Sequence, residues 1–184
     1  MGKTALLIID VQNDYFTDGK MPLPGAGEAG TNIRAVLDGF RKEKIPVIHI
    51  QHESIQEGAT FFLAGTDGVN IHKSVLPEEG EAIIIKNYPN SFLKTELLQY
   101  LRDNDITKLV ITGMMTFMCV DATTRAAKDL GFECILLHDC TAAPPTEFAG
   151  VSCSAEQVRA AVTSALSLIC DEVIGSQEFL ERLL

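Results

Sequence analysis

The feature that most constrains this chain is a regular alternation of short, almost uninterrupted apolar runs with segments of helical periodicity. The runs lack the polar alternation of a half-exposed strand, which is typical of strands buried on both faces of a parallel sheet. Five clear runs and a weaker sixth occupy residues 5–9, 46–50, 82–85, 109–112, 134–137 and 172–174. Because parallel strands need right-handed crossovers, the pattern predicts a three-layer α/β/α sandwich with a mostly parallel sheet of about six strands.

Between these runs, apolar residues recur every three or four positions, which indicates helices that cover the sheet. The helical spacing is carried by Ile33, Val36, Leu37 and Phe40; by Leu93, Leu97 and Leu101; by Thr123, Ala126, Ala127 and Leu130; and by Val158, Val162, Ala165, Leu166 and Ile169. Ser154 and Gln157 match a capping box before the last helix, and Gly131 is placed to end the third. The length of 184 residues suits one core, so we expect a single domain over residues 1–184.

Charge and hydropathy exclude several classes of partner. The chain has 15 Lys and Arg against 25 Asp and Glu, and its formal net charge of -10 disfavours nucleic acid and anionic lipid surfaces. The apolar runs are far shorter than the roughly 20 residues that span a membrane, and the N-terminal sequence does not match a signal peptide. We therefore expect a cytoplasmic protein that binds a small molecule and neither nucleic acid nor membrane.

The five cysteines are odd in number and show no C-x-x-C spacing, which predicts free thiols rather than a disulfide framework. Four of them are expected to be small buried residues: Cys134, Cys140, Cys153 and Cys170. Cys119 differs because it follows the fourth run at the predicted start of a helix. Backbone N–H groups and the helix dipole favour a thiolate at such a position.

The residues that end the apolar runs carry unusual chemistry. Ligands of parallel α/β sheets bind at the carboxyl ends of strands, and the first run ends in Asp10, the third in Lys86, and the fourth leads to Cys119. An acid that transfers protons, a thiol nucleophile and an amine that keeps the acid and the thiol ionised together indicate acyl transfer. The backbone N–H groups before the thiol could donate hydrogen bonds to the oxyanion that forms. Two sheet orders remain open, one with direct neighbours and one in which Lys86 reaches across an intervening strand.

Three motifs follow one another at these strand ends. They comprise Asp10, Gln12 and Phe16; Lys86, Ser91 and Phe92; and Gly113, Thr116, Cys119, Val120, Thr123 and Arg125. In this order they resemble the isochorismatase-like cysteine hydrolases, a family that includes nicotinamidases and N-carbamoylsarcosine amidases. The resemblance implies a triad of Asp10, Lys86 and Cys119 and a homo-oligomer that is a dimer or a tetramer. The chemistry of such a triad requires no cofactor. The resemblance also implies a cis peptide at Met114-Met115 that shapes an oxyanion hole at Met115 and Cys119.

Side chains near the triad are expected to bind the substrate. Gln12, Phe16, Thr116 and Phe117 belong to the motif segments, and Phe62 belongs to the long glycine-containing loop after the second run. The aromatic residues among them could instead belong to the core, and the long loop is a candidate lid or subunit contact.

Four histidines raise the question of a metal site. The nicotinamidases place an Asp and several His after the second strand, whereas this chain has His49, His52 and Glu53 there and no Asp in that segment. We therefore predict structural histidines and no metal, with an improvised site of these three residues as the alternative. The same departure argues against nicotinamide as the substrate.

The sequence leads to the hypothesis that the chain hydrolyses a C–N bond of a small amide, carbamoyl or ureido compound through a thioester on Cys119. One alternative is vinyl-ether hydrolysis of the isochorismate type, in which the aspartate donates a proton and no nucleophile is needed. Another is a small-molecule binder or thiol redox sensor without catalytic activity on the same scaffold. The retained Cys119 favours amide chemistry, and the complete triad favours catalysis over binding alone.

Overall fold

A computed structural model describes residues 2–183, so Met1 and Leu184, at the ends of the expected domain, lie outside the described residues. Its centre is a six-stranded sheet in which every neighbouring pair is parallel, in the order β3-β2-β1-β4-β5-β8. The strands are β1 (Lys3–Ile9), β2 (Val47–His52), β3 (Ala82–Lys86), β4 (Ile106–Met114), β5 (Glu133–Ala142) and β8 (Glu172–Ile174). The predicted parallel sheet of about six strands is confirmed.

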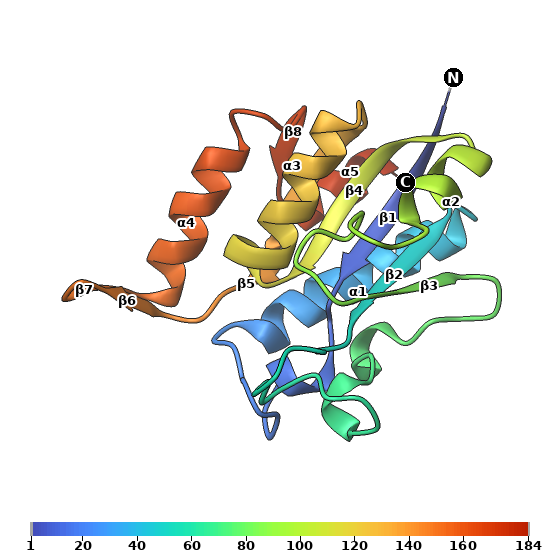
Figure 1. Cartoon of the computed structure of the whole chain (residues 1–184). Coiled ribbons are helices and arrows are strands. Elements are labelled where there is room, and N and C mark those ends of the chain that lie inside the picture. Colours follow the sequence, from blue (N-terminus) through green and yellow to red (C-terminus); the bar gives the residue numbers. More distant parts are fainter. Residues whose placement is uncertain (1, 184) are drawn as a thin grey trace.

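Helices cover both faces of this sheet (Figure 1). They are α1 (Ala26–Lys42), α2 (Leu97–Asp103), α3 (Asp121–Asp129), α4 (Ala155–Leu166) and α5 (Ser176–Leu183). Apolar residues of α1 and α5 pack on one face, and those of α2, α3 and α4 pack on the other. The fold is therefore the predicted three-layer α/β/α sandwich. Within residues 2–183, no helix combines the length and apolar character that a bilayer crossing requires.

Strand β1 shows why most of the runs are apolar at every position; the expectation of burial on both faces is wrong for β3, an edge strand in which Ile83 and Ile85 are exposed. Leu6 and Ile8 belong to the core on the α1 side, whereas Leu7 and Ile9 belong to the core on the α2 side, and all four are buried. A strand that is covered on both faces has no exposed side on which polar residues could alternate. The polar residue that follows such a strand therefore lies at the carboxyl edge of the sheet, where the candidate site is built.

The connections contain structure that the sequence did not indicate. Short helical turns occur at η1 (Asn13–Tyr15), η2 (Asp67–Val69), η3 (Lys73–Val75) and η4 (Thr116–Val120). A two-stranded hairpin of β6 (Thr146–Phe148) and β7 (Val151–Cys153) projects from the body between β5 and α4 (Figure 1). The cross-strand pair of this hairpin, Phe148 and Val151, is largely exposed.

Two helix boundaries differ from the expected ones, and helix α5 was not anticipated. Helix α2 begins only at Leu97, so Leu93 lies in the preceding turns and is exposed, and helix α4 ends before Ile169. The capping box is confirmed, because the Gln157 backbone N–H donates to Ser154 Oγ and the Ser154 backbone N–H donates to Gln157 Oε1. Apolar periodicity thus located the helices, and local hydrogen bonding decided where they begin and end.

Strands β1 and β4 approach each other closely at the carboxyl edge of the sheet. Gly113 has a φ of 122°, and a Cβ atom added there would lie 2.0 Å from the Ile9 carbonyl oxygen, so the position requires glycine. Strand β3, in contrast, is separated from β1 by β2. Of the two arrangements that the sequence left open, the structure has the one in which Lys86 reaches across an intervening strand.

Candidate active site

The candidate site is built on a buried ion pair between the ends of β1 and β3. The Lys86 Nζ atom lies 2.7 Å from Asp10 Oδ2, and both side chains are fully buried. Asp10 has a φ of 52°, a left-handed conformation that aspartate tolerates better than most residues, and it turns the chain away from β1. Its backbone N–H still donates to the Ile50 carbonyl oxygen at 3.0 Å, so the sheet fixes the aspartate in place.

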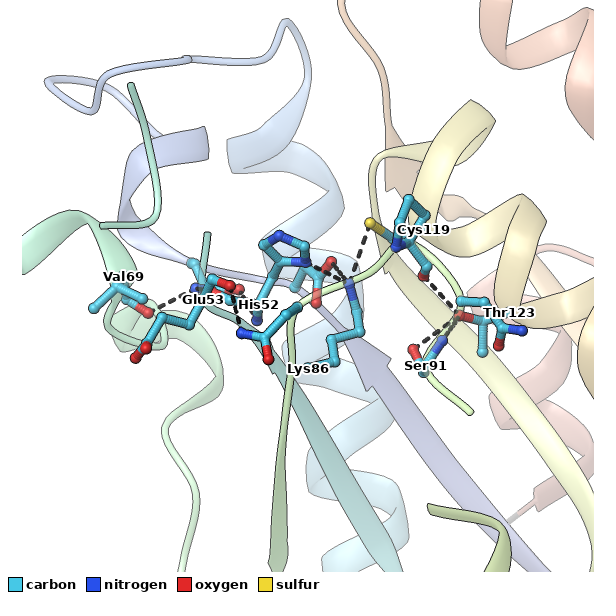
Figure 2. Close-up of polar contacts among 12 residues, drawn as sticks. His52, Glu53, Val69, Lys86, Ser91, Cys119 and Thr123 are labelled. Atoms are coloured by element: carbon cyan, nitrogen blue, oxygen red, sulfur yellow. Dashed lines mark hydrogen bonds and ion pairs between the residues drawn. The ribbon is translucent and has the colours of Figure 1, made fainter. Parts of the chain in front are cut away.

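The thiol of Cys119 lies against the same lysine. Cys119 Sγ is 3.3 Å from Lys86 Nζ, and Figure 2 shows the lysine amino group between this sulfur and the His52 ring. Cys119 lies in the π-helical turn η4 and precedes α3 by two residues, so the expected position at the helix start is only approximately right. The structure thus brings the three predicted triad residues, Asp10, Lys86 and Cys119, into direct contact.

His52 completes the set of groups around the lysine. Its Nδ1 atom is 2.9 Å from Lys86 Nζ, and because an ammonium can only donate, Nδ1 is the acceptor and the ring proton lies on Nε2. Burial and the neighbouring Lys86 charge lower the pKa of His52 to about 4, so the imidazole is neutral near pH 7. The three N–H bonds of Lys86 are therefore matched by three acceptors, Asp10 Oδ2, His52 Nδ1 and Cys119 Sγ.

The charges of the cluster follow from its burial and its close pairing. Burial lowers the pKa of Lys86, but the Asp10 carboxylate and the Cys119 sulfur outweigh this effect and raise it, so the amine stays charged. Burial and the Asp10 charge raise the pKa of Cys119, which Lys86 offsets only in part. The resting thiolate expected from the sequence is therefore not supported, since burial and the Asp10 charge oppose the helix-end effect. The resting sulfur is a thiol that must lose its proton when it attacks.

A proton acceptor for that thiol is available within the cluster. Asp10 Oδ2 is bonded to Lys86, whereas Asp10 Oδ1 has no hydrogen-bond partner among the described residues. One ligand atom from each of Asp10, His52 and Cys119 lies within 4.8 Å of the others. A carboxylate oxygen of Asp10 thus lies within 4.8 Å of the sulfur, which makes this carboxylate the candidate acceptor of the thiol proton.

The backbone before Cys119 has the expected special geometry. The Met114-Met115 peptide bond is cis, which confirms the feature implied by the family resemblance. The turn that follows is closed by the Val120 N–H, which donates to the Met115 carbonyl oxygen at 3.2 Å. This arrangement places Met115 and Cys119 together on the wall of one pocket.

That pocket has a volume of about 360 Å³ and leads to Cys119. Its apolar wall consists of Tyr15, Ala59, Phe61, Pro89, Met115 and Met118. Its polar wall comes from the end of β2, with His52, and from the segment that follows, with Ser54, Gln56 and Glu57. The segment is held in a closed loop by the Ser54 N–H, which donates to the Phe62 carbonyl oxygen at 2.9 Å.

Gln12 does not line this pocket, contrary to the expectation that it binds the substrate. Its Nε2 donates to the carbonyl oxygens of His52 and Val69 at 2.8 and 2.7 Å, and its Oε1 accepts from the His52 N–H at 2.8 Å. The amide is therefore fully used in tying the end of β2 to the following loop. Gln12 positions His52 and has no donor left for a ligand.

The expected aromatic contacts with the substrate also lie elsewhere. Phe16 stacks on His72, with ring centroids 3.5 Å apart, and lines a larger hollow of about 690 Å³ away from Cys119. Phe62 is buried against Tyr15, and Phe117 packs on the core beside α1. A large apolar side chain in a motif segment can pack in the core or line a pocket, and the sequence alone did not distinguish these two roles.

Thr116, the remaining residue expected to bind substrate, is buried in the turn before Cys119 and is not among the pocket-lining residues. Of the residues that line the pocket, only Met115 and Cys119 were predicted as site residues. The lining residues that were missed are Tyr15, His52, Ser54, Gln56, Glu57, Gly58, Ala59, Phe61, Pro89 and Met118. His52 had a usable signal, because it closely follows an apolar run, as Asp10 and Lys86 do. The others come from loops and turns, and no pattern in the sequence distinguished them.

The motif residues Ser91 and Thr123 have a supporting role. The Ser91 N–H donates to Thr123 Oγ1 at 3.0 Å, and the two hydroxyl groups are 2.8 Å apart (Figure 2). Both residues are buried. They join the loop after β3 to α3, and so hold the segment that follows Lys86 against the helix that follows Cys119.

The proposed alternative of a joint metal site at His49, His52 and Glu53 does not fit the strand geometry. His49 and His52 are an odd number of residues apart in β2, and they lie on opposite faces of the sheet, His49 with Glu81 and His52 with Lys86. Asp10, His52 and Cys119 do form a group with metal-ligating atoms. The Lys86 ammonium is bonded to all three residues and supplies the positive charge between them.

Known proteins resemble this chain over most of its length. The Isochorismatase domain model matches residues 4–167. The isochorismatase family protein YddQ of Bacillus subtilis is 40% identical over 178 residues, which cover 97% of this chain and 99% of the relative. A solved structure from Oleispira antarctica, described as an isochorismatase hydrolase, is 47% identical, covers 98% of this chain and 97% of its own, and superposes with a TM-score of 0.94.

A relative with a named activity is more distant. The ureidoacrylate amidohydrolase RutB of Rhizobium rhizogenes is 27% identical over 178 residues, which cover 76% of this chain and 70% of the relative. The match of the family model over most of the chain, together with the 40% identity to YddQ, decides the assignment. The chain belongs to the isochorismatase family and is a hydrolase of that family.

Proposed function

We propose that this hydrolase cleaves the C–N bond of a small amide, carbamoyl or ureido compound through a covalent thioester on Cys119. The observation that carries the proposal is that one buried ammonium, Lys86, holds both a carboxylate and a thiol at the base of a pocket. A site that only binds a ligand has no need of a proton acceptor beside a sulfur atom. The amidohydrolase named among the relatives supports the same class of reaction.

In the first half of the reaction, Asp10 Oδ1 accepts the thiol proton as Cys119 Sγ attacks the carbonyl carbon of the substrate. The carbonyl oxygen becomes an oxyanion, which the backbone N–H groups of Met115 and Cys119 stabilise. Lys86 keeps its bond to Asp10 throughout and balances the negative charge that moves from carboxylate to sulfur.

In the second half, the protonated Asp10 donates its proton to the leaving nitrogen, and ammonia or an amine departs as the thioester forms. Asp10, again a carboxylate, accepts a proton from water, and the resulting hydroxide attacks the thioester carbon. Collapse of this second intermediate breaks the C–S bond, and Asp10 returns the proton to the sulfur. No group outside Asp10, Lys86, Cys119 and the backbone is required for the cycle.

The test measures ammonia release from a panel of small amides, ureido acids, carbamoyl amino acids and nicotinamide, with and without prior thiol alkylation and with and without a chelator. We expect release from at least one class that alkylation abolishes and the chelator leaves unchanged. Replacing Cys119 by Ala should lower this turnover by about a thousandfold or more, because the nucleophile is lost.

Cys140→Ala is the matched control, because Cys140 is also a buried free thiol but does not line the pocket. This variant should keep its activity in the molecules that fold. Normal turnover by the Cys119→Ala variant would overturn the thioester mechanism. Ammonia release that survives alkylation would also overturn it, because the amide would then be cleaved without the thiol. No release from any member of the panel would favour the ether-type reaction, in which Asp10 acts without a nucleophile, or a binder without catalytic activity.

A further inference from the structure

The pocket above Cys119 has an asymmetric charge distribution. Among its lining residues in the described chain, Glu57 is the one with a formal charge near pH 7, and none is Lys or Arg. Glu57 lies in the exposed loop after β2, at the turn that contains Gly58. The wall of the pocket therefore carries one carboxylate and no Lys or Arg side chain.

The base of the pocket does not provide a cation either. The positive charge of Lys86 is matched by the Asp10 carboxylate at 2.7 Å. The same amino group donates to Asp10, His52 and Cys119, so all three of its N–H bonds are occupied. A carboxylate on the substrate could bind Lys86 only by displacing Asp10, His52 or Cys119 from its amino group.

An anionic substituent would thus be desolvated without compensation. Much of the wall is apolar, with Tyr15, Phe61, Met115 and Met118, and a carboxylate moved from water into such surroundings needs a partner charge or several donors. A cationic substituent, in contrast, meets the Glu57 carboxylate and two aromatic rings, which attract cations. The formal net charge of -10 on the chain acts in the same direction at long range.

We propose that this site accepts amides without a negative charge, neutral or cationic, and that Glu57 is the residue that sets this preference. The substrate class rests on the proposed amide hydrolysis. It separates this chain from its relative RutB, whose named substrate, ureidoacrylate, contains a carboxylate. It also argues against isochorismate, which carries two carboxylates.

The charge of the pocket can be measured without knowing the substrate. The probes are three methanethiosulfonates that differ only in the substituent on the reactive sulfur: methyl, trimethylammonioethyl or sulfonatoethyl. A protein thiol attacks this sulfur and forms a mixed disulfide that carries the substituent, and methanesulfinate is released. The rates of the three probes at Cys119 are read by peptide mass mapping and divided by their rates with 2-mercaptoethanol. Cys153, a half-buried thiol outside the pocket, is the internal control.

At low salt, the cationic reagent should modify Cys119 roughly tenfold or more faster than the anionic one after this correction, and high salt should reduce the ratio. Glu57→Gln should lower the ratio about threefold, and Glu57→Lys should bring it to about one or below. Glu79→Gln is the matched control, because Glu79 is exposed and lies beyond the amino end of β3, whereas Lys86 lies at its carboxyl end. It changes the net charge equally and should leave the ratio unchanged.

A second arm uses turnover of three amides that share a three-carbon chain: pentanamide, 4-aminobutanamide and glutaramate. The neutral and cationic amides should be hydrolysed with a kcat/KM at least about tenfold above that of the anionic one, and Glu57→Lys should narrow this gap. Equal reagent rates at Cys119 in the parent protein, or no change on Glu57→Lys, would overturn the inference. If no amide is hydrolysed while the reagent ratios hold, the proposed function fails and the charge selectivity of the pocket stands.

Discussion

Strand β2 carries a buried histidine on each of its two faces, and each histidine sits in an ionic cluster. The His49 cluster, defined as Arg41, His49 and Glu81, lies on the side of α1. The His52 cluster, defined as Asp10, His52, Lys86 and Cys119, lies at the carboxyl edge on the opposite side. Both clusters combine one cation, one carboxylate and one imidazole, yet we assign a reaction to only one of them.

Charge does not distinguish the two clusters, and burial does so only slightly: the Arg41 and Glu81 side chains are 13% and 11% exposed, whereas those of Lys86 and Asp10 are fully buried. Arg41 donates two hydrogen bonds to Glu81, at 2.7 and 2.8 Å, and His49 Nε2 lies 2.9 Å from the same carboxylate. Burial raises the pKa of Glu81, but the bonds from Arg41, the Glu78 N–H and His49 lower it to about 2. Each cluster even leaves one buried polar atom without a partner among the described residues, His49 Nδ1 and Asp10 Oδ1.

Access and reactivity make the difference. The His49 cluster contains no nucleophile, and His49 lines neither of the two hollows described above. The His52 cluster contains a thiol, and His52 and Cys119 line the pocket wall. A shifted pKa is therefore a poor marker of function by itself, whereas a shifted pKa beside a reactive atom and an open pocket is a good one.

The largest expected effect comes from removing the cation of each cluster. Lys86→Met should abolish turnover and lower the free energy of unfolding by roughly 3–5 kcal/mol, because it leaves the Asp10 carboxylate buried without a charge partner. Arg41→Met should cost less, about 1–3 kcal/mol, because His49 can take up a proton beside Glu81. Urea titration and kcat/KM at a temperature where both variants are folded make the comparison.

Lys86→Arg keeps the charge and provides a check if Lys86→Met fails to fold. Its planar guanidinium cannot match three acceptors arranged around a single nitrogen, so we expect a folded protein with strongly reduced turnover. Full activity of Lys86→Arg would show that only the charge matters. A loss of kcat/KM in folded Arg41→Met as large as that in Lys86→Arg would remove the distinction between the clusters.

The carboxylates provide the second test. Asp10→Asn should reduce turnover by about a thousandfold, because the amide cannot accept the thiol proton. Glu81→Gln should leave kcat/KM within about threefold while lowering stability by roughly 1–3 kcal/mol, since one acceptor of the Arg41 fork is lost. Steady-state rates combined with thermal unfolding curves separate the two effects. Similar losses of turnover in both variants would contradict the assignment of the site to one face.

The smallest expected effect is the response to acid. The pKa of His52 falls from 6.5 to about 4 on folding, so between these values the unfolded chain binds the proton and the folded chain does not. Its contribution to stability is complete above pH 6.5 and decreases as the pH falls towards 4, by up to roughly 3 kcal/mol. Burial also lowers the pKa of His49. There the effect of Glu81, which raises the pKa, exceeds that of Arg41, whereas at His52 the effect of Lys86, which lowers the pKa, exceeds that of Asp10.

His52→Asn keeps an acceptor for Lys86 and removes the titrating ring. We expect it to flatten the dependence of stability on pH between 6.5 and 4 more than His49→Asn does. Urea unfolding free energies of both variants at half-unit pH intervals would measure this difference. Equal flattening by both variants would mean that the two faces of β2 have the same electrostatic environment.

Much of the fold could be predicted because it depends on local patterns. Most of the strands are recognisable because both of their faces are covered, although β3 is apolar with one face exposed. Asp10, Lys86 and Cys119 could be found because each interrupts or follows an apolar run at the same edge of the sheet. His52 obeys the same rule. It was considered only as a metal ligand or a structural histidine, because the lysine that it faces enters from another strand.

The pocket wall could not be predicted, because it depends on contacts distant in sequence. The role of Gln12 follows from partners 40 and 57 residues away, and these bonds fix the path of the loop that carries Phe61. Whether Phe16 or Phe61 faces the pocket is decided by that path and not by either residue. The thiol pKa has a similar origin, since it depends on how deeply the fold buries Cys119.

Lys86 occupies the last position of β3, and β3 lies at the edge of the sheet, paired with β2 on one side only. Edge strands open locally more readily than central ones, without unfolding of the rest of the molecule. Opening of these five residues would withdraw the ammonium from the carboxylate and the thiol together. Heat or denaturant should therefore inactivate the enzyme before the fold is lost. The fraction of molecules in which β3 is open to backbone hydrogen exchange should match the fraction that has lost activity.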